Sequence, residues 1–197
     1  MRIFRLPALA FLIACGSGAA LAASPATDKT VQFTGAAAIL PSGLMMIEGH
    51  EVTLWGIDLL ASDQQCWHDD RAWNCGEEYM LALRHHLAGH HLHCIVNSDK
   101  GGGKVTAQCF IKNGTKEDDL ARYLIAEGWA RDRAADSGSY YAADEEKART
   151  RRRGIWTSRF QSAEDWKNGA PNYIEYQQTP SPKSPVAHGA DVTKKQQ

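Results

Sequence analysis

Between residues 31 and 57, apolar and polar positions alternate in short runs, a pattern typical of antiparallel strands. Residues that favour tight turns, at 41–43 and 48–49, separate these runs. Strands are therefore expected at 31–34, 39–40, 44–47 and 50–57, and two more at 92–96 and 105–111. Strands spaced this closely predict a meander that closes into a small barrel.

Three later segments carry apolar residues at helical spacing instead. Residues 76–88 are expected to form the first helix, which ends at Gly89. A second helix is expected to open at residues 115–118, which resemble a capping box, and a third to run from about 139 to 153. Strands and helices together predict an α+β fold.

The two ends of the chain differ in composition from its middle. Basic residues, an apolar run and then small residues predict a signal peptide over residues 1–22, and the apolar run is too short to span a membrane. The alternative is a lipobox ending at Cys15, which would then carry a lipid anchor. The proline- and lysine-rich segment 170–197 is expected to be a disordered tail, so the folded domain covers about residues 31–168.

The cysteines are consistent with an exported protein. Setting Cys15 aside leaves four, an even number that favours two disulfides in an oxidising compartment, with three possible pairings. The expected hairpin at 92–111 brings Cys94 and Cys109 within reach of each other, which leaves Cys66 to pair with Cys75. We therefore expect two bridges, Cys94–Cys109 and Cys66–Cys75, and a location in the periplasm or outside the cell.

Composition and charge exclude several classes of protein. With 43% apolar and 23% charged residues, the 197-residue chain is not a disordered polyelectrolyte, a collagen-like repeat or a coiled coil. Its 22 basic and 23 acidic side chains give a formal charge of -1. Any site for a polyanion therefore has to be a local patch.

A series of short motifs, in order along the chain, resembles the staphylococcal (thermo)nuclease-like (SNase-like) family. Leu54-Trp55-Gly56-Ile57-Asp58 followed by Gln65-Cys66 is similar to the family's RLxGIDAPE…Q.C segment, and residues 103–109 are similar to its YGR..A.C segment. Gly128-Trp129-Ala130 and Gly154-Ile155-Trp156 continue the match. The resemblance implies a five-stranded OB-type β-barrel with three helices, in agreement with the hydrophobic pattern.

The resemblance also implies a catalytic set, most of which this chain lacks. The family cleaves phosphodiesters with calcium held by two aspartates, a glutamate beside the attacking water, and two arginines that stabilise the developing charge. Counted without gaps from Asp58, this chain keeps that aspartate and has Lys104 in place of one arginine. The second aspartate, the second arginine and the glutamate fall on Gly43, Thr53 and Ala61.

These replacements argue against efficient hydrolysis. A single carboxylate is a poor site for calcium, which takes about six to eight oxygen ligands. Lys104 is a point charge without the two-pronged donor geometry of arginine. We expect a pseudoenzyme with Asp58 and Lys104 as catalytic remnants, no cofactor, and calcium only if some nuclease activity remains. Whether the protein is an enzyme stays open at this point.

A group of histidines offers a different chemistry. If residues 90–97 are extended, His91 and His93 share one face of the strand, and exported histidine clusters can bind zinc or copper. His91 and His93, with Asp58 as a further ligand, are therefore the candidate metal residues. The competing interpretation is a polar helix end followed by a surface strand. The whole group is His85, His86, His90, His91 and His93.

Three hypotheses for function follow. The first is an exported binding or accessory module of the cell envelope, whose ligand is a polysaccharide, a nucleic acid or a protein. The second is a divergent metal-dependent phosphodiesterase that uses Asp58 and Lys104. The third is an envelope metal-binding protein that uses the histidine cluster.

Overall fold

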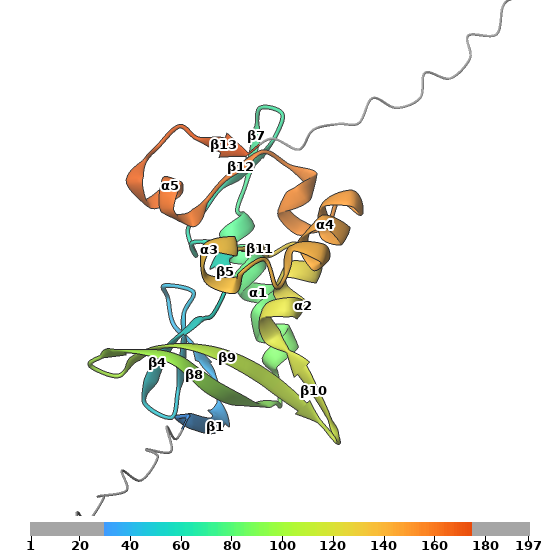
Figure 1. The fold of residues 1–197 in the computed structure, drawn as a ribbon. Helices are drawn as coiled ribbons and strands as arrows, with labels where there is room; N and C mark the ends of the chain where they lie inside the picture. Colours follow the sequence, from blue (N-terminus) through green and yellow to red (C-terminus); the bar gives the residue numbers. More distant parts are fainter. Residues whose placement is uncertain (1–29, 175–197) are drawn as a thin grey trace, which may run out of the picture.

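The computed structural model describes residues 30–174 as a mixed α+β structure (Figure 1). A curled sheet lies at one end of the molecule, and most helices lie beside or beyond it. The predicted signal peptide, Cys15 and most of the predicted tail lie outside the described residues. Within residues 30–174, no helix is long and apolar enough to cross a membrane.

All six strands expected from the sequence are present, and the curled sheet pairs them in the order β1-β8-β9-β4-β3-β2. The pairs are antiparallel except for β4 with β9, which is parallel. The strands are β1 (Gln32–Ala36), β2 (Ala38–Ile39), β3 (Met45–Ile47), β4 (His50–Leu54), β8 (His91–Gly101) and β9 (Lys104–Asn113), with β10 (Lys116–Asp119) added to the edge of β9.

The first and last strands of this order are neighbours in the sequence. Only Ala37 separates β1 from β2. The β1 half pairs with β8, where Thr34 lies opposite His93, and the β2 half pairs with β3, where Ala38 lies opposite Met46. The pairing ladder therefore begins and ends on one short stretch of chain, which explains why the sheet is strongly curled.

Alternate residues of the strands fill the inside of the curled sheet. On β9 the buried positions are Val105, Ala107, Cys109 and Ile111, each separated by a less buried residue. Cys109 lies directly opposite Cys94 on β8, and the two form a disulfide in this core. The predicted Cys94–Cys109 bridge is therefore confirmed.

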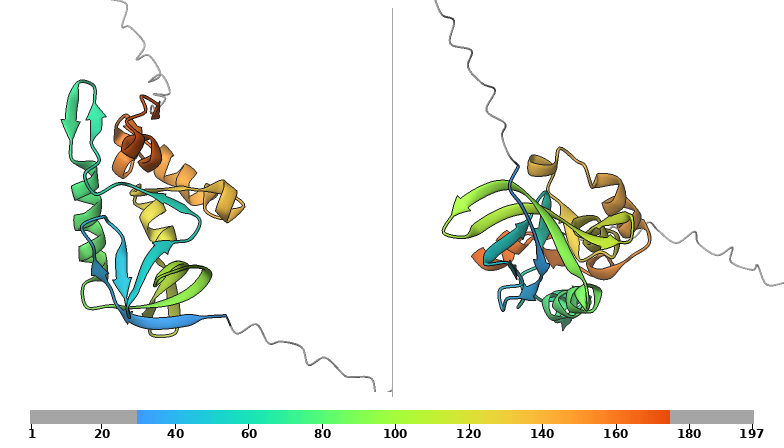
Figure 2. Two further views of the ribbon diagram at one scale, coloured as in Figure 1. Left: turned by 90° about the vertical axis from the view of Figure 1, so that its left-hand side faces the viewer. Right: turned by 90° about the horizontal axis from the view of Figure 1, so that it is seen from below.

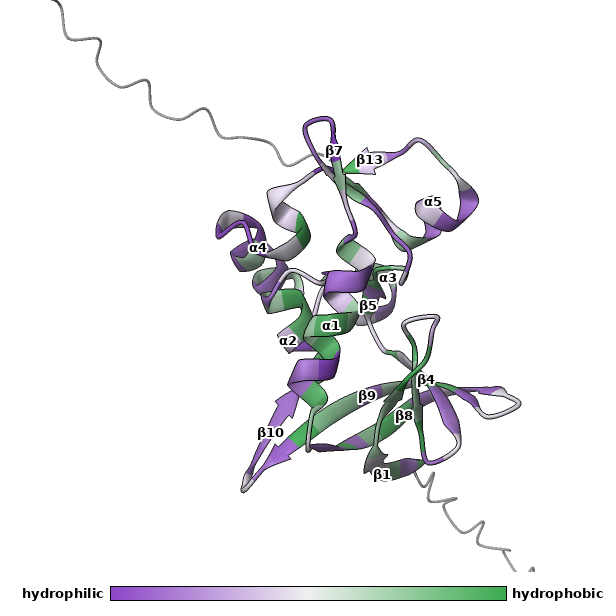
Figure 3. Ribbon diagram, turned by 180° about the vertical axis from the view of Figure 1, so that it is seen from behind, coloured by the Kyte–Doolittle hydropathy of each residue, from purple (hydrophilic) through white to green (hydrophobic). Residues whose placement is uncertain are grey.

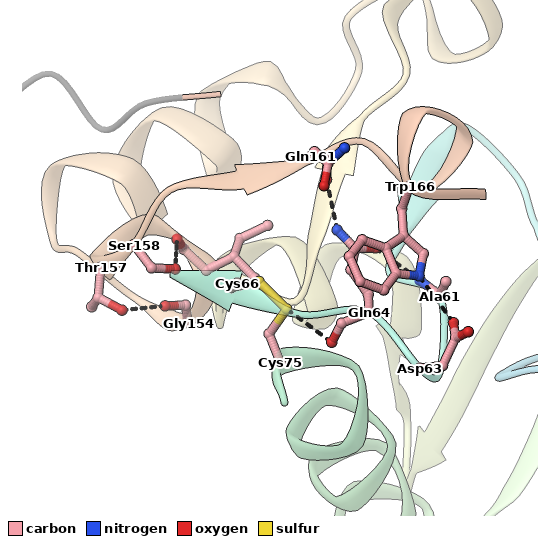
Figure 4. Close-up of a disulfide and its surroundings, with 11 residues drawn as sticks. Ala61, Asp63, Gln64, Cys66, Cys75, Gly154, Thr157, Ser158, Gln161 and Trp166 are labelled. Atoms are coloured by element: carbon pink, nitrogen blue, oxygen red, sulfur yellow. Dashed lines mark hydrogen bonds between the residues drawn. A yellow bond between two sulfur atoms is a disulfide. The ribbon is translucent and has the colours of Figure 1, made fainter. Parts of the chain in front are cut away.

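The predicted Cys66–Cys75 bridge is also confirmed (Figure 4). It joins β6 (Cys66–His68) to the first residue of α1 (Cys75–Leu87). Between the two cysteines, β6 pairs with β7 (Arg71–Trp73) in a hairpin that extends beyond the end of α1, away from the curled sheet (Figure 2). Both bridged cysteines are fully buried.

The helices are more numerous than the three that were expected. The second begins at Leu120, because residues 116–119 pair with β9 instead, and the Asp119 carboxylate accepts hydrogen bonds from the Ala121 and Arg122 amides. The third is shorter than expected and is preceded by a separate turn of helix. The helices after α1 are α2 (Leu120–Ala126), α3 (Ala134–Ser137), α4 (Ala142–Thr150), the 3-10 helix η1 (Gly154–Thr157) and α5 (Ala163–Asn168).

Two short strand pairs lie outside the curled sheet. The first joins β5 (Ile57–Leu59) to β11 (Ala130–Asp132). Of β5, only Ile57 had been expected to be extended, as the last residue of a strand over 50–57. The second joins β12 (Phe160–Gln161) to β13 (Tyr173–Ile174). Paired structure thus extends as far as Ile174.

Hydropathy follows this architecture (Figure 3). Apolar residues line the inner strands and the facing sides of α1 and α2, whereas β10 is largely hydrophilic. The core contains Leu83 of α1, Leu124 of α2 and Trp156 of η1, all at most 1% exposed. One hydrophobic core therefore joins the curled sheet to the helices and fixes the position of β5 and β11 between them.

Candidate functional site: a charged pocket around Asp58

Asp58, the retained carboxylate, lies in the middle of β5 opposite Arg131 of β11. Its Oδ1 is 3.4 Å from Nη2 of Arg133, and Nη1 of the same arginine is 3.4 Å from Oδ2 of Asp136. Tight charge-assisted hydrogen bonds are shorter, about 2.7–2.9 Å. Arg133 is therefore loosely shared between two carboxylates, and its side chain is 48% exposed.

Two adjoining hollows open beside Asp58. The larger, of about 400 Å³, lies between Leu44, Thr53 and α5. The smaller, of about 300 Å³, lies along β11 and the start of α3. Both are lined by Asp58, Arg133 and Glu164, and we call them together the Asp58 pocket. The elements that form it meet in the middle of Figure 1, with α5 on the outer side.

The wall formed by α5 is held in place by contacts with the chain that follows β5 (Figure 4). Nε1 of Trp166 donates a hydrogen bond to Oδ1 of Asp63 at 3.1 Å. Gln64 is fully buried, and its amide donates to the Gln161 carbonyl at 2.7 Å and accepts from the Ala61 amide at 3.1 Å. The Cys66–Cys75 bridge follows directly, so the disulfide supports this side of the pocket.

Charged side chains line the pocket in equal numbers of each sign. The three acidic residues and three basic residues balance, so the pocket has no excess of positive charge. Binding to a phosphate backbone depends on such an excess. Alternating donors and acceptors suit a ligand rich in hydroxyl groups. The six residues are Asp58, Asp132, Glu164, Arg131, Arg133 and Lys167.

Lys104, the other predicted catalytic remnant, does not line either hollow. It is the first residue of β9, opposite Glu51 of β4, and its ammonium is 3.7 Å from the Glu51 carboxylate. The lysine side chain is 65% exposed. The structure therefore pairs both remnants with partners of opposite charge, but in two different places.

Two of the three positions at which the resemblance places further catalytic groups are unsuited to charged side chains. Gly43 has a φ of +85°, which strains any other residue, and its carbonyl accepts a hydrogen bond from Tyr79, whose pKa is raised by burial. Ala61 is 5% exposed, and its carbonyl oxygen packs closely against Gly76. A Cβ added to Gly76 would lie only 2.2 Å from that oxygen. Thr53 lines the larger hollow but carries no charge.

The candidate metal residues are not brought together. Asp58 lies on β5, whereas His91 and His93 lie on β8, where Nδ1 of His93 is 3.1 Å from the Thr34 hydroxyl. Within residues 30–174, no three or more histidine, cysteine or acidic side chains are arranged to hold a metal ion. His86 stacks on Tyr123, and burial and the nearby charge of His90 lower its pKa.

Five charged residues of the pocket were not identified from the sequence: Arg131, Asp132, Arg133, Glu164 and Lys167. A signal was present, because Arg131 and Arg133 alternate around Asp132 directly after the Gly128-Trp129-Ala130 motif. What the sequence did not reveal is that this segment pairs with the strand that carries Asp58.

Comparisons with known proteins add one relative and one structure. The chain is 30% identical over 124 residues to "Succinoglycan biosynthesis protein ExoI" of Rhizobium meliloti (strain 1021). The match covers 62% of this chain and 63% of the relative, so the chain spans less than two thirds of that protein. A solved structure, the extended Tudor domain of Drosophila melanogaster Tudor-SN (p100), is similar over 54% of this chain and 47% of its own, with 21% identity and a TM-score of 0.40. No family model matches the chain.

Proposed function

We propose that this protein is an exported, divergent member of the SNase-like family that binds an envelope polysaccharide without hydrolysing it. The observation that carries the proposal is the Asp58 pocket. It is open, polar and balanced in charge, while the positions that the resemblance assigns to catalysis carry no matching groups. The protein therefore keeps a place for a ligand but lacks the groups that would cleave a phosphodiester.

We further infer that the curled sheet closes as a five-stranded barrel of the OB type. Strands β1 and β2 together count as one strand, bent at Ala37, that pairs with β8 on one side and β3 on the other. OB-fold barrels bind oligonucleotides and oligosaccharides on their strand face and through neighbouring loops. The Asp58 pocket lies directly after β4, next to such a face.

The charge distribution favours a sugar polymer over a nucleic acid. Proteins that bind nucleic acid do so largely by neutralising phosphates with excess lysine and arginine. Here three carboxylates offset the three cations of the pocket, and the whole chain has a formal charge of -1. The name of the 30%-identical relative, which refers to the biosynthesis of a polysaccharide, supports the same choice.

Hydrolysis is disfavoured by the ion pair at Asp58. Arg133 contacts the Asp58 carboxylate, which calcium would need as a ligand, and Lys104 forms an ion pair with Glu51. Removing a single donor that stabilises transition-state charge typically lowers kcat by about 10²–10³. Several such groups are missing here, so residual activity would be far below that of a functional nuclease.

An oxidising compartment is part of the proposal. Two fully buried disulfides support it, because such bridges form and persist outside the cytoplasm. We propose cleavage after Ala22, with a lipid anchor at Cys15 as the alternative. The mass of the mature N-terminus distinguishes the two.

Affinity electrophoresis together with a cleavage assay tests the proposed function. Oxidised protein should be retarded in gels that contain an envelope-type polysaccharide, and it should leave single-stranded DNA and RNA intact in the presence of calcium, magnesium or zinc. Lys104→Ala is the matched control, because it removes a cation outside the pocket and should bind like the wild type. Metal-dependent cleavage that is lost in Asp58→Ala would establish the phosphodiesterase alternative. Stoichiometric zinc or copper that is lost in His91→Ala/His93→Ala would establish the metal-binding alternative.

A further inference from the structure

Two arginines border the smaller hollow of the Asp58 pocket. Arg131 lies in β11, and Arg133 is the residue between β11 and α3. Both line the hollow together with Asp58. Neither occupies a position where the resemblance places an arginine, since those positions are Thr53 and Lys104. The two arginines of this hollow therefore come from a different part of the chain.

The Arg131 side chain has one hydrogen-bond donor that is unsatisfied. Its Nε is buried and has no hydrogen-bond partner among residues 30–174. A buried donor without a partner is costly, so a shift of the Arg131 side chain that brings Nε to an acceptor in the adjoining hollow would be favourable. Its positive charge also reaches the start of α5, where it helps hydrogen bonds from Ser162 and Asn172 to lower the pKa of Asp165.

Arg133 is also able to accept a further partner. Its two 3.4 Å contacts, to Asp58 and Asp136, leave its guanidinium without a tight bidentate pair. A planar guanidinium matches a planar carboxylate with two parallel hydrogen bonds. A ligand carboxylate in the hollow would therefore compete well with the two long contacts that hold Arg133 now.

We propose that Arg131 and Arg133 form a carboxylate subsite that receives an acidic sugar residue of the polysaccharide ligand. This inference rests on the proposed function and names the class of sugar that the pocket takes. The carboxylate of the sugar lies between the two guanidinium groups. Its hydroxyl groups donate to the acidic residues around them, chiefly Glu164, which lines the same hollow.

The acidic residues of the hollow explain why a sugar carboxylate fits better than a nucleic acid. A uronic acid carries one negative charge and several neutral hydroxyl donors, which matches a wall that has both arginines and carboxylates. A phosphodiester backbone carries one charge at every residue as well, but it offers few hydroxyl donors to the carboxylates of the hollow.

Calorimetric titration with three hexasaccharides tests the subsite. The probes are hexagalacturonate, its methyl ester and neutral maltohexaose. Wild-type protein should bind hexagalacturonate at least about tenfold more tightly than the methyl ester. Arg131→Gln and Arg133→Gln should each lower affinity for the acid about tenfold or more, the size expected for a lost charged hydrogen bond, without affecting the ester. Arg131→Lys should fall between wild type and glutamine, because it keeps the charge but loses the fork.

The other possible outcomes would overturn either the carboxylate subsite or the proposed function. Equal wild-type affinity for the acid and its ester overturns the subsite but leaves polysaccharide binding intact. Retardation by no polysaccharide at all overturns the proposed function itself. Tighter binding of oligothymidylate than of hexagalacturonate, lost in the same two variants, assigns the arginines to phosphate and also overturns the proposal. The comparison of acid with ester uses wild-type protein alone, so it holds even if an arginine variant fails to fold.

Discussion

Two sets of positions around Asp58 differ in what they carry. The positions where the resemblance places further catalytic groups are Gly43, before β3, Thr53, in β4, and Ala61, after β5, and none of them is charged. On the side of β11 and α5, the pocket is lined by two arginines, a lysine and two carboxylates besides Asp58 itself. The charged groups of the hollow thus come from parts of the chain other than the positions at which the resemblance places catalytic groups.

Placing a glutamate at position 61, where the resemblance expects one, tests whether the uncharged positions can still accept a catalytic group. Ala61→Glu would place a carboxylate at a site that is 5% exposed and tightly packed against α1, so we expect the free energy of unfolding to fall by about 3 kcal/mol or more. Chemical denaturation measures the change, and Ser62→Glu, at the half-buried neighbouring position, is the control. A variant that is as stable as wild type and has gained calcium binding would show that the catalytic side is still usable.

Removing the two disulfides one at a time distinguishes their contribution to the stability of the fold from their contribution to ligand binding. Cys66→Ala/Cys75→Ala and Cys94→Ala/Cys109→Ala should each lower the free energy of unfolding by about 2–4 kcal/mol. Only the first pair borders the segment that holds α5 over the pocket, so only the first should also weaken binding of hexagalacturonate. Equal loss of binding in both variants would contradict the view that the two regions are supported separately.

Removing the charge of Asp58 tests how far its contact with Arg133 limits ligand affinity in the pocket. In Asp58→Asn the long contact to the half-exposed Arg133 is weakened, so stability should change by no more than about 1 kcal/mol. Affinity for hexagalacturonate should rise, because Arg133 loses a competing carboxylate. Titration calorimetry measures this, with Glu51→Gln, which removes the partner of Lys104, as the matched control that should leave affinity unchanged. Weaker binding in Asp58→Asn would mean that Asp58 itself holds the ligand.

The smallest expected effect lies outside both regions, in the histidine group. Burial and the charge of His90 lower the pKa of His86, while Asp118 and Glu127 oppose the shift. The folded state therefore binds fewer protons than the unfolded state, in which the pKa is about 6.5. Stability should fall as the pH drops from about 6.5 toward the lowered value, and then level off. His86→Gln should flatten this part of the pH profile of urea unfolding and leave sugar binding at pH 7 unchanged. An identical slope in the variant would contradict the assignment.

The sequence predicted the parts of the fold that depend on neighbouring residues. Alternation located the six main strands, and the hairpin that joins β8 to β9 placed Cys94 opposite Cys109. The start of α2 was misplaced because residues 115–118 fit a capping box as well as an edge strand, and only the vacant edge of β9 decides between them. The paired strand at 173–174 was missed for the same reason: its partner, β12, is not apparent from composition.

The site could be predicted only in part, because its two halves are far apart in the sequence. The resemblance identified Asp58 and showed which groups are missing. The arginine that contacts Asp58 lies 75 residues later, and α5 comes later still. No local pattern links a short strand such as β5 to β11, so the charged wall of the pocket emerges only when the chain is folded.

If the Asp58 pocket binds an acidic sugar through Arg131 and Arg133, the two guanidinium groups should respond directly to the ligand. Side-chain Nε–Hε resonances of 15N-labelled arginines, followed by NMR during titration with hexagalacturonate, test it most directly, with assignments from Arg131→Lys and Arg133→Lys. The Arg131 and Arg133 signals should shift saturably, and those of Arg149 and Arg122, which stack on aromatic rings elsewhere, should be unaffected. Shifts confined to other arginines, or none at concentrations where binding is saturated, would contradict it.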